Sequence, residues 1–256
     1  MKTLKAGLIS AGGVSQSFVA RMPALLKTVG PVKATSARVA RRIANSLRAG
    51  SPVEGYGALN GCPVIWIALP EAGLDRVLRE FSAEAPLAGK KIVICGTARP
   101  SGSFPELADA FVATLDCVPG DERTLVAEGH PMALREIDRA AVAERRKLIK
   151  IAMKPAYLAG VHFASGLLLP YFSSAVEMLR QTGFSRMEAT RVAEGLGSRT
   201  LRAYAKAGRK AWSRVAAIDL RASRERDGAA IRAADGPRAA LYERGIEQAL
   251  EYFKDE

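Results

Sequence analysis

A short turn near the N-terminus carries the most distinctive chemical pattern of the chain. Residues 4–10 form an apolar run typical of a buried strand, and apolar side chains at helical spacing follow from Phe18 to Leu26. A tight turn between a strand and a helix can bind phosphate, because the free N–H groups at the start of the helix attract anions. The residues that would bind a dinucleotide in this turn are Ser10, Ala11, Gly12, Gly13, Val14 and Ser15.

This turn matches the dinucleotide pattern Gly-x-Gly-x-x-Gly only in part. Its three positions hold Ser10, Gly12 and Ser15, so the middle glycine alone is present. That glycine lets the backbone approach a pyrophosphate, and serine is small enough to replace the other two. An ordinary glycine-rich turn remains the alternative interpretation.

The residues after the second expected strand, at 31–35, predict which dinucleotide would bind. In NAD sites an Asp or Glu about 20 residues past the glycines accepts hydrogen bonds from a ribose hydroxyl. This chain has Ser36, Arg38 and Arg41 there, and its first 50 residues contain nine basic residues and no acidic one. Hydroxyl and guanidinium donors suit a 2'-phosphate, so NADP is the predicted cofactor. The alternative is a solvated basic helix face.

Apolar strands alternate with helices through the rest of the N-terminal part. This alternation predicts a Rossmann-type α/β fold, with a mainly parallel sheet covered on both faces. Ligands of such sheets bind beyond the carboxyl ends of the strands, so Leu69, Pro70, Gly96 and Thr97 are expected to border the cofactor. The expected strands are 63–70, 91–95, 112–116, 124–128 and 147–151, with helices at 39–47, through 74–78 and at 132–144.

The chain becomes mainly helical after Met153. One long helix is expected from Lys154 to Phe172, and others at 184–207 and 238–253, with a polar, arginine-rich connection at 221–235. The sequence therefore predicts two domains, a Rossmann-like NADP-binding domain at 1–152 and an all-helical C-terminal domain at 153–256.

Three side chains of the long helix are candidates for catalysis. Transfer of a hydride to a carbonyl or an imine needs a group that protonates or polarises the atom gaining charge. Lys154 is the first candidate, because it stands where the last strand meets the helix and can act as an acid or hold a carboxylate. Tyr157 and Ser165 follow on the same helix. A surface lysine and packed side chains are the alternatives, and Asp116 and Glu128, which end strands, are interpreted as structural.

The other reactive residues predict no further site. Cys62, Cys95 and Cys117 are widely spaced with no CxxC pair, and the only histidines are His130 and His162. Neither a disulfide framework nor a metal site is expected.

Composition and charge limit the class of protein. With 256 residues, 48% of them hydrophobic and 25% charged, the chain is globular in composition. No apolar run approaches the roughly 18 residues of a membrane span, and no signal peptide is evident, so a cytoplasmic protein is expected. The net charge of +12 leaves a nucleic-acid-binding protein as an alternative. An aromatic content of 6% and the lack of a known binding module argue against it.

Four segments, taken in order, resemble a known superfamily. They are 7–15, 66–71, 126–129 and 154–165. The chain resembles the two-domain reductases that include pyrroline-5-carboxylate reductase, ketopantoate reductase and the β-hydroxyacid dehydrogenases. It looks most like the Rossmann-like members whose helical C-terminal domain has no known function. The resemblance implies an NADP-binding domain, an interdomain cleft for a small anionic substrate, and a homodimer formed through the helical domain.

Three positions depart from that superfamily's pattern. Cys117, Leu158 and Gly166 stand where its members often have His, His and Asn. Two readings therefore stay open: an NADPH-dependent reductase acting on a small anionic carbonyl or imine compound, and a non-catalytic NADP-binding sensor or partner-binding dimer.

Overall fold

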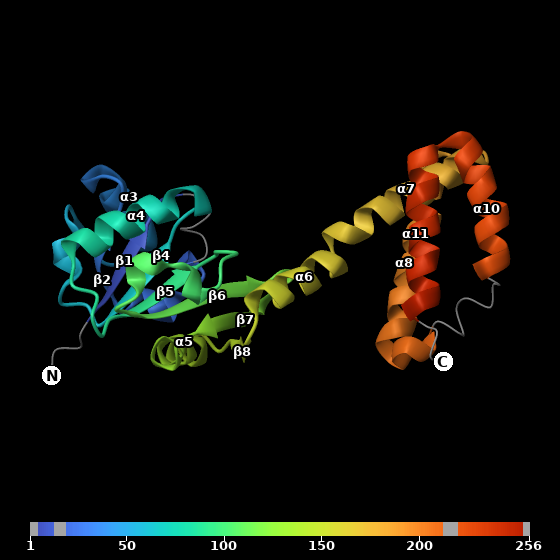
Figure 1. Cartoon of the computed structure of the whole chain (residues 1–256). Coiled ribbons are helices and arrows are strands. Elements are labelled where there is room, and N and C mark those ends of the chain that lie inside the picture. Colours follow the sequence, from blue (N-terminus) through green and yellow to red (C-terminus); the bar gives the residue numbers. More distant parts are fainter. Residues whose placement is uncertain (1–4, 13–18, 212–219, 253–256) are drawn as a thin grey trace. The chain divides into compact units, whose positions relative to one another are not determined.

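The computed structural model describes residues 5–12, 19–211 and 220–252, and for residues 220–223, 225, 234 and 252 it describes the backbone alone. The chain divides into two compact units, Met1–Val161 and His162–Glu256. The first contains a sheet with helices, and the second is helical (Figure 1).

The first unit is built on one eight-stranded sheet with the order β3-β2-β1-β4-β5-β6-β7-β8. Neighbouring strands are parallel except for β6 and β7, which pair antiparallel. The predicted Rossmann-type, mainly parallel sheet is therefore confirmed. The strands are β1 (Ala6–Ser10), β2 (Val29–Lys33), β3 (Ser51–Val53), β4 (Val64–Ala68), β5 (Lys91–Cys95), β6 (Phe111–Val118), β7 (Asp121–Gly129) and β8 (Lys147–Lys150).

Apolar layers cover both faces of this sheet. One face packs against α2 (Pro23–Leu26), α3 (Ala37–Leu47) and α5 (Pro131–Ala143). The other packs against α4 (Glu71–Glu84) and the 3-10 turns η1 (Tyr56–Leu59) and η3 (Pro105–Leu107), with η2 (Ser101–Ser103) nearby. Figure 1 shows the strands between α4 and α5. Burial on both faces explains why β4 and β5 are apolar at nearly every position.

The helices of the C-terminal part follow β8. Among them α7 packs against α8, and α10 against α11. A capping box begins α8, in which Ser185 accepts from the N–H of Glu188 and Glu188 accepts from the N–H of Ser185. Among the described residues, no helix is both long and apolar enough to cross a bilayer. The helices and turns are α6 (Lys154–Ala164), η4 (Gly166–Leu168), α7 (Leu169–Gln181), α8 (Arg186–Ala207), η5 (Gly208–Lys210), α10 (Leu220–Ala234) and α11 (Gly236–Tyr252).

The predicted continuous helix from Lys154 to Phe172 is wrong. It is interrupted at Ser165, whose backbone angles of φ −132° and ψ −89° are not helical. The turn η4 follows, and α7 then begins with Pro170 in its first turn, a position that suits proline. Phe172 therefore does not continue the face that His162 occupies on α6.

The predicted connection at 221–235 is also wrong, because these residues form helix α10. Arginine, glutamate and alanine are good helix formers, but a helix that is polar on most sides shows no apolar periodicity. Ion pairs of Arg224 with Glu247 and of Arg232 with Glu243 tie α10 to α11.

Candidate functional site

Strand register brings several predicted cofactor residues to one edge of the sheet. Ser10 pairs with Ala68, and Ala68 pairs in turn with Cys95. Leu69 directly follows Ala68, and Gly96 directly follows Cys95. The carboxyl ends of β1, β4 and β5 therefore lie side by side. The Ser10 hydroxyl is buried there and has no hydrogen-bond partner among the described residues. An unpaired buried hydroxyl is unusual, and it marks this edge as a place where a polar ligand would be accommodated.

The turn after β1 is described only at its beginning. The N–H of Ala11 donates to the carbonyl of Ala68 at 3.4 Å, and Gly12 is half-buried. Gly13, Val14 and Ser15 lie outside the described residues, so their predicted contacts with a phosphate remain predictions.

The turn after β5 is open on one side and fixed on the other. Gly96 has φ of 74°, in the left-handed region, and a side chain at this position would meet no atom within 4 Å. Thr97 donates its hydroxyl to Glu71 at 2.8 Å and accepts from the N–H of Arg99 at 3.1 Å. These bonds hold the turn against the first residue of α4, which positions Leu69 and Pro70 beside it.

The basic residues expected to bind a 2'-phosphate lie at the start of α3, after β2. Ser36 is the N-cap of α3, and its hydroxyl accepts from the N–H of Val39 at 3.3 Å. Arg38 and Arg41 are exposed in the first turns, and within the described ranges neither forms an ion pair with a carboxylate. The helix contains no acidic residue. It therefore presents an uncompensated positive charge beside β2, the neighbour of β1.

Lys154 is the most deeply buried charged residue of this region. Its side chain is 2% exposed, and its Nζ lies 2.7 Å from Oδ2 of Asp116, whose side chain is 21% exposed. Asp116 follows Leu115, which pairs with Cys95, so the ion pair adjoins the same sheet edge. Burial raises the pKa of Asp116 above its ordinary value, and the ammonium of Lys154 opposes that rise.

Tyr157 lies one turn further along α6, next to the same carboxylate. Its hydroxyl is buried and has no hydrogen-bond partner within the described residues. Burial raises the pKa of Tyr157, and the charges of Asp116 and Cys117 raise it further. Asp116, Lys154 and Tyr157 thus form one buried polar cluster, hereafter the Asp116 cluster. A buried hydroxyl without a partner, here that of Tyr157, beside a buried ion pair is typical of a ligand-binding site.

Asp116 is the residue that sequence reasoning interpreted differently. We expected it to be structural, whereas it is the direct partner of the leading catalytic candidate. The available signal was a single carboxylate within the otherwise apolar strand β6. Glu128 fits its structural interpretation, because its carboxylate accepts from Ser101 at 2.6 Å and from Thr114 at 3.1 Å.

Other predicted residues are not brought into this cluster. Ser165 is exposed and belongs to the second unit. His130 caps α5 by accepting from the N–H of Met132 at 3.2 Å, and its ring stacks on Phe111. In the described part of the chain, no three His, Cys, Asp or Glu side chains are grouped to hold a metal ion.

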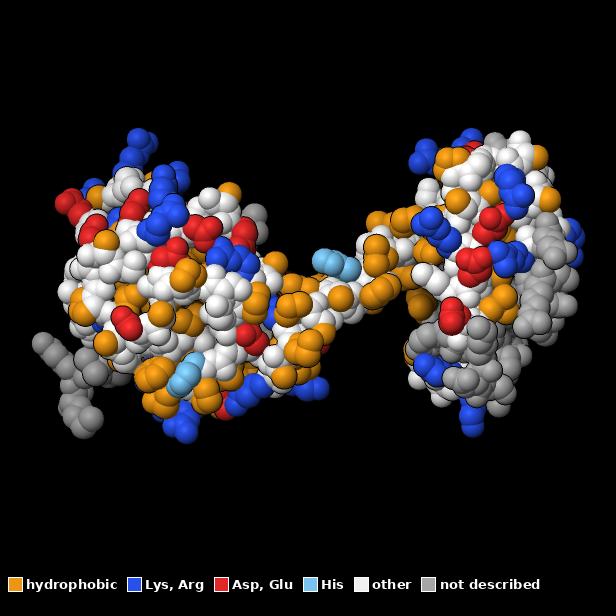
Figure 2. All heavy atoms as spheres, viewed as in Figure 1, with side chains coloured by type: hydrophobic (Ala, Val, Ile, Leu, Met, Phe, Trp, Pro, Cys, Tyr) orange, Lys and Arg blue, Asp and Glu red, His pale blue; other side chains and the backbone are white. Residues whose placement is uncertain are grey.

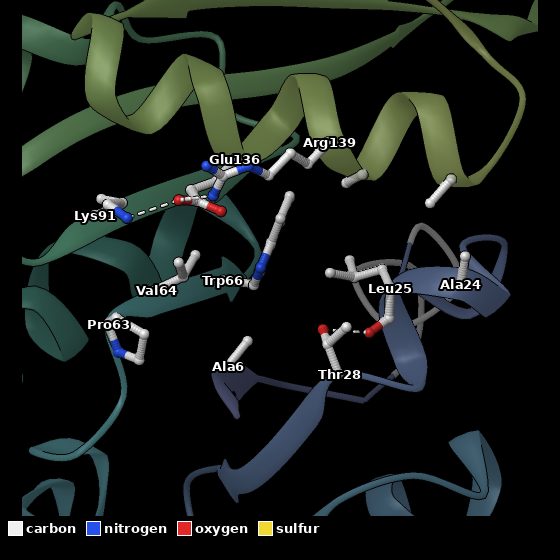
Figure 3. A pocket seen from close by; sticks show the side chains of 12 residues that line it. Ala6, Ala24, Leu25, Thr28, Pro63, Val64, Trp66, Lys91, Glu136 and Arg139 are labelled. Carbon is white, nitrogen blue, oxygen red and sulfur yellow. Dashed lines mark hydrogen bonds and ion pairs between the residues drawn. The ribbon is translucent and has the colours of Figure 1, made fainter. Parts of the chain in front are cut away.

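A cavity of about 550 Å³ lies at the opposite edge of the sheet (Figure 3). It is lined by the first residues of three strands, Ala6, Val64 and Lys91, and by residues of α5. None of the residues predicted for cofactor or catalysis lines it. The candidate site is therefore assigned to the carboxyl edge, where the unpaired hydroxyls and the buried ion pair gather.

Comparisons by sequence find neither a matching family model nor a matching curated protein. Solved structures with the same fold were found. One is a protein from Bacteroides fragilis named as a candidate NADP oxidoreductase, with 11% identity, a TM-score of 0.72, and coverage of 97% of this chain and 98% of that one. Another is an imine reductase from Aspergillus terreus in complex with NADPH4, with 18% identity, a TM-score of 0.63, and coverage of 97% and 95%.

A third is a pyrroline-5-carboxylate reductase from Coxiella burnetii, with 11% identity and a TM-score of 0.56 over 99% of this chain and 98% of that one. At these identities the likeness concerns the fold. The chain thus shares, over nearly its whole length, the fold of the reductases that its sequence resembles.

Proposed function

We propose that this chain is an NADPH-dependent reductase acting on a small anionic carbonyl or imine compound. The observation that carries the proposal is the buried Lys154–Asp116 ion pair, 2.7 Å apart, beside the carboxyl edge of a Rossmann-type sheet. The fold is shared with an imine reductase and with a pyrroline-5-carboxylate reductase, both of which act on C=N bonds by their names.

The residues at the carboxyl edge fit an NADP cofactor. Ser10 offers an unpaired hydroxyl, and the space beside Gly96 is open, since a Cβ there would meet no atom within 4 Å. The 2'-phosphate of the nucleotide would be held by Ser36, Arg38 and Arg41. The residues that would border the rest of the nucleotide are Ser10, Ala11, Gly12, Gly13, Val14, Ser15, Leu69, Pro70, Gly96 and Thr97. When bound, NADPH supplies a hydride to an electrophilic carbon.

Within the Asp116 cluster, each residue has a distinct proposed role. Asp116 lies 2.7 Å from Nζ of Lys154 and compensates the charge of that buried ammonium. One of the three N–H donors of the ammonium faces Asp116, and the other two remain for a carbonyl oxygen, an imine nitrogen or a carboxylate of the substrate. Tyr157 would add its hydroxyl as a second donor. Ser165 remains a proposed substrate contact.

The C-terminal part, 153–256, is proposed to bind substrate and to form a homodimer. Large apolar side chains are exposed on its helices (Figure 2), including Phe163 at 68% and Met187 at 77%. Exposed apolar area of this kind favours association. Light scattering would measure the oligomeric state directly.

The test is oxidation of NADPH with a panel of small 2-oxo acids and cyclic imines. Lys154→Met is expected to abolish turnover while NADPH affinity stays within about twofold. The double variant Lys154→Met/Asp116→Asn, which leaves no unpaired charge, guards against a loss of fold. Lys150→Met, which removes an exposed lysine paired with Asp138 at 3.2 Å, is the matched control. NADPH binding without turnover on any compound would favour the non-catalytic alternative.

A further inference from the structure

The cavity at the amino-terminal edge of the sheet is separate from the proposed reductase site. Val64 begins β4 and Lys91 begins β5, whereas Leu69 and Gly96 follow the other ends of the same strands. A molecule in the cavity and a nucleotide at the carboxyl edge would therefore bind at opposite ends of the two strands. The volume, about 550 Å³, is within the range of small-molecule sites.

Small side chains create this space between the sheet and two helices. Ala6 on β1, Ala24 on α2, and Ala140 and Ala143 on α5 line it. Trp66 and Val64 form an apolar floor on β4. The walls therefore favour a flat apolar body.

Charged side chains at one side of the cavity favour an anion. Oε1 of Glu136 accepts from Nζ of Lys91 at 2.7 Å and from Nη1 of Arg139 at 2.8 Å (Figure 3). Burial alone would raise the pKa of Glu136, but Lys91 and Arg139 outweigh it and hold this pKa below its ordinary value, so the group carries one negative charge against two positive ones. The cluster retains a charge of +1.

The same cluster has more hydrogen-bond donors than acceptors. An ammonium has three N–H donors and a guanidinium five, and Lys91 and Arg139 both donate to one oxygen, Oε1 of Glu136. Among the described residues, no other acceptor contacts either group. A ligand with acceptor oxygens would satisfy these donors, and one with further donors would not.

Trp66 supplies the aromatic surface of the cavity. The residue is 2% exposed and belongs to the apolar core on this face of the sheet. An aromatic ring packs favourably against another flat apolar group. Trp66 lines the cavity and stands between the sheet and α5 (Figure 3).

We propose that this cavity binds a small aromatic carboxylate. The aromatic body would pack between Val64, Trp66 and Ala140, and the carboxylate would accept from Lys91 and Arg139. This site is additional to the proposed reductase function and does not depend on it.

Three probes with one aromatic body and different charge test the proposal by calorimetry without any nucleotide: 2-naphthoate, 2-naphthylmethanol and 2-naphthylmethylammonium. We expect 2-naphthoate to bind at least tenfold more tightly than either of the others. Equal affinities for all three, or no binding of 2-naphthoate at millimolar concentration, would overturn the proposal.

Two variants locate the binding. Arg139→Gln removes a side chain that is 72% exposed, so the fold should tolerate it, and the Kd of 2-naphthoate is expected to rise about tenfold. Arg135→Gln, an exposed arginine of the same helix outside the cavity, should change the Kd by less than twofold.

Ala140→Leu fills the cavity and should abolish binding while leaving the melting temperature unchanged or higher, because cavity-filling substitutions commonly stabilise a fold. Its control is Val142→Leu, at an exposed position of α5. Unchanged binding in both Arg139→Gln and Ala140→Leu would contradict the assignment. NADPH affinity is measured in each variant, so a failure of this site and a failure of the reductase proposal give different results.

Discussion

At the scale of single residues, the Asp116 cluster determines the chemistry available to the site. The buried ammonium of Lys154 has a carboxylate 2.7 Å away, that of Asp116. Removing one member of a buried ion pair leaves the other unpaired, which commonly costs about 3–5 kcal/mol, whereas removing both costs much less.

A double-mutant cycle measures this coupling. Lys154→Met alone should lower the free energy of unfolding by about 2–3 kcal/mol, somewhat less than for a fully buried pair, because Asp116 is partly exposed. Adding Asp116→Asn should recover most of that loss in urea denaturation. Strict additivity of the two single effects would show that the pair is not coupled.

The sequence predicts Lys154 and Tyr157 as catalytic candidates and Asp116 as a structural residue. Lys154 and Tyr157 are three residues apart on α6, and this helical spacing is visible in the local sequence. The pairing of Lys154 with Asp116 joins residues 38 positions apart in the sequence, and it exists only because α6 returns to the edge of β6. Such long-range pairing has no local signal, and only the isolated carboxylate in an apolar strand pointed to it.

At the scale of elements, the start of α3 should decide which nucleotide binds. Its exposed Arg38 and Arg41 have no compensating carboxylate in the part of the chain that the structure describes. They therefore remain available for a phosphate group, for which charge-assisted hydrogen bonds are strong.

Replacing both residues, Arg38→Gln/Arg41→Gln, should raise the Kd of NADPH at least tenfold while changing that of NADH less than threefold. Calorimetry on the two cofactors measures the difference. The control is Arg76→Gln/Arg79→Gln, which removes two exposed arginines from α4. An equal rise in the Kd of NADPH and of NADH would show that the two arginines do not bind the 2'-phosphate.

Elements with a strong apolar pattern were predicted well, and elements without one were not. Strand β5 was expected at 91–95 and is found there, because it is buried on both faces. The three-residue edge strand β3 was not anticipated, since its exposed Ser51 and Pro52 give no pattern. Helix α10 shows little apolar pattern either, because six of its 15 residues are charged, and its sequence therefore predicts a connection.

At the scale of the whole molecule, the order of elements was more informative than any single motif. Gly12 is the only glycine of the dinucleotide pattern at its expected position, yet alternating apolar strands and helices followed by helices alone predicted the observed architecture. Packing of a parallel sheet constrains the sequence over its whole length, whereas a binding turn constrains a few residues. This explains why the fold was predictable at identities of 11% to 18% to solved structures while the substrate was not.

A thermal-shift titration with NADPH, NADP⁺, NADH and NAD⁺ would show whether the carboxyl edge of the sheet binds NADP. A ligand at about 100 times its Kd stabilises a fold by roughly 2.7 kcal/mol, which corresponds to a few degrees for a chain of this size. We predict that the two phosphorylated nucleotides raise the melting temperature by that amount and that the other two do so far less. No shift with any of the four would contradict nucleotide binding at this edge.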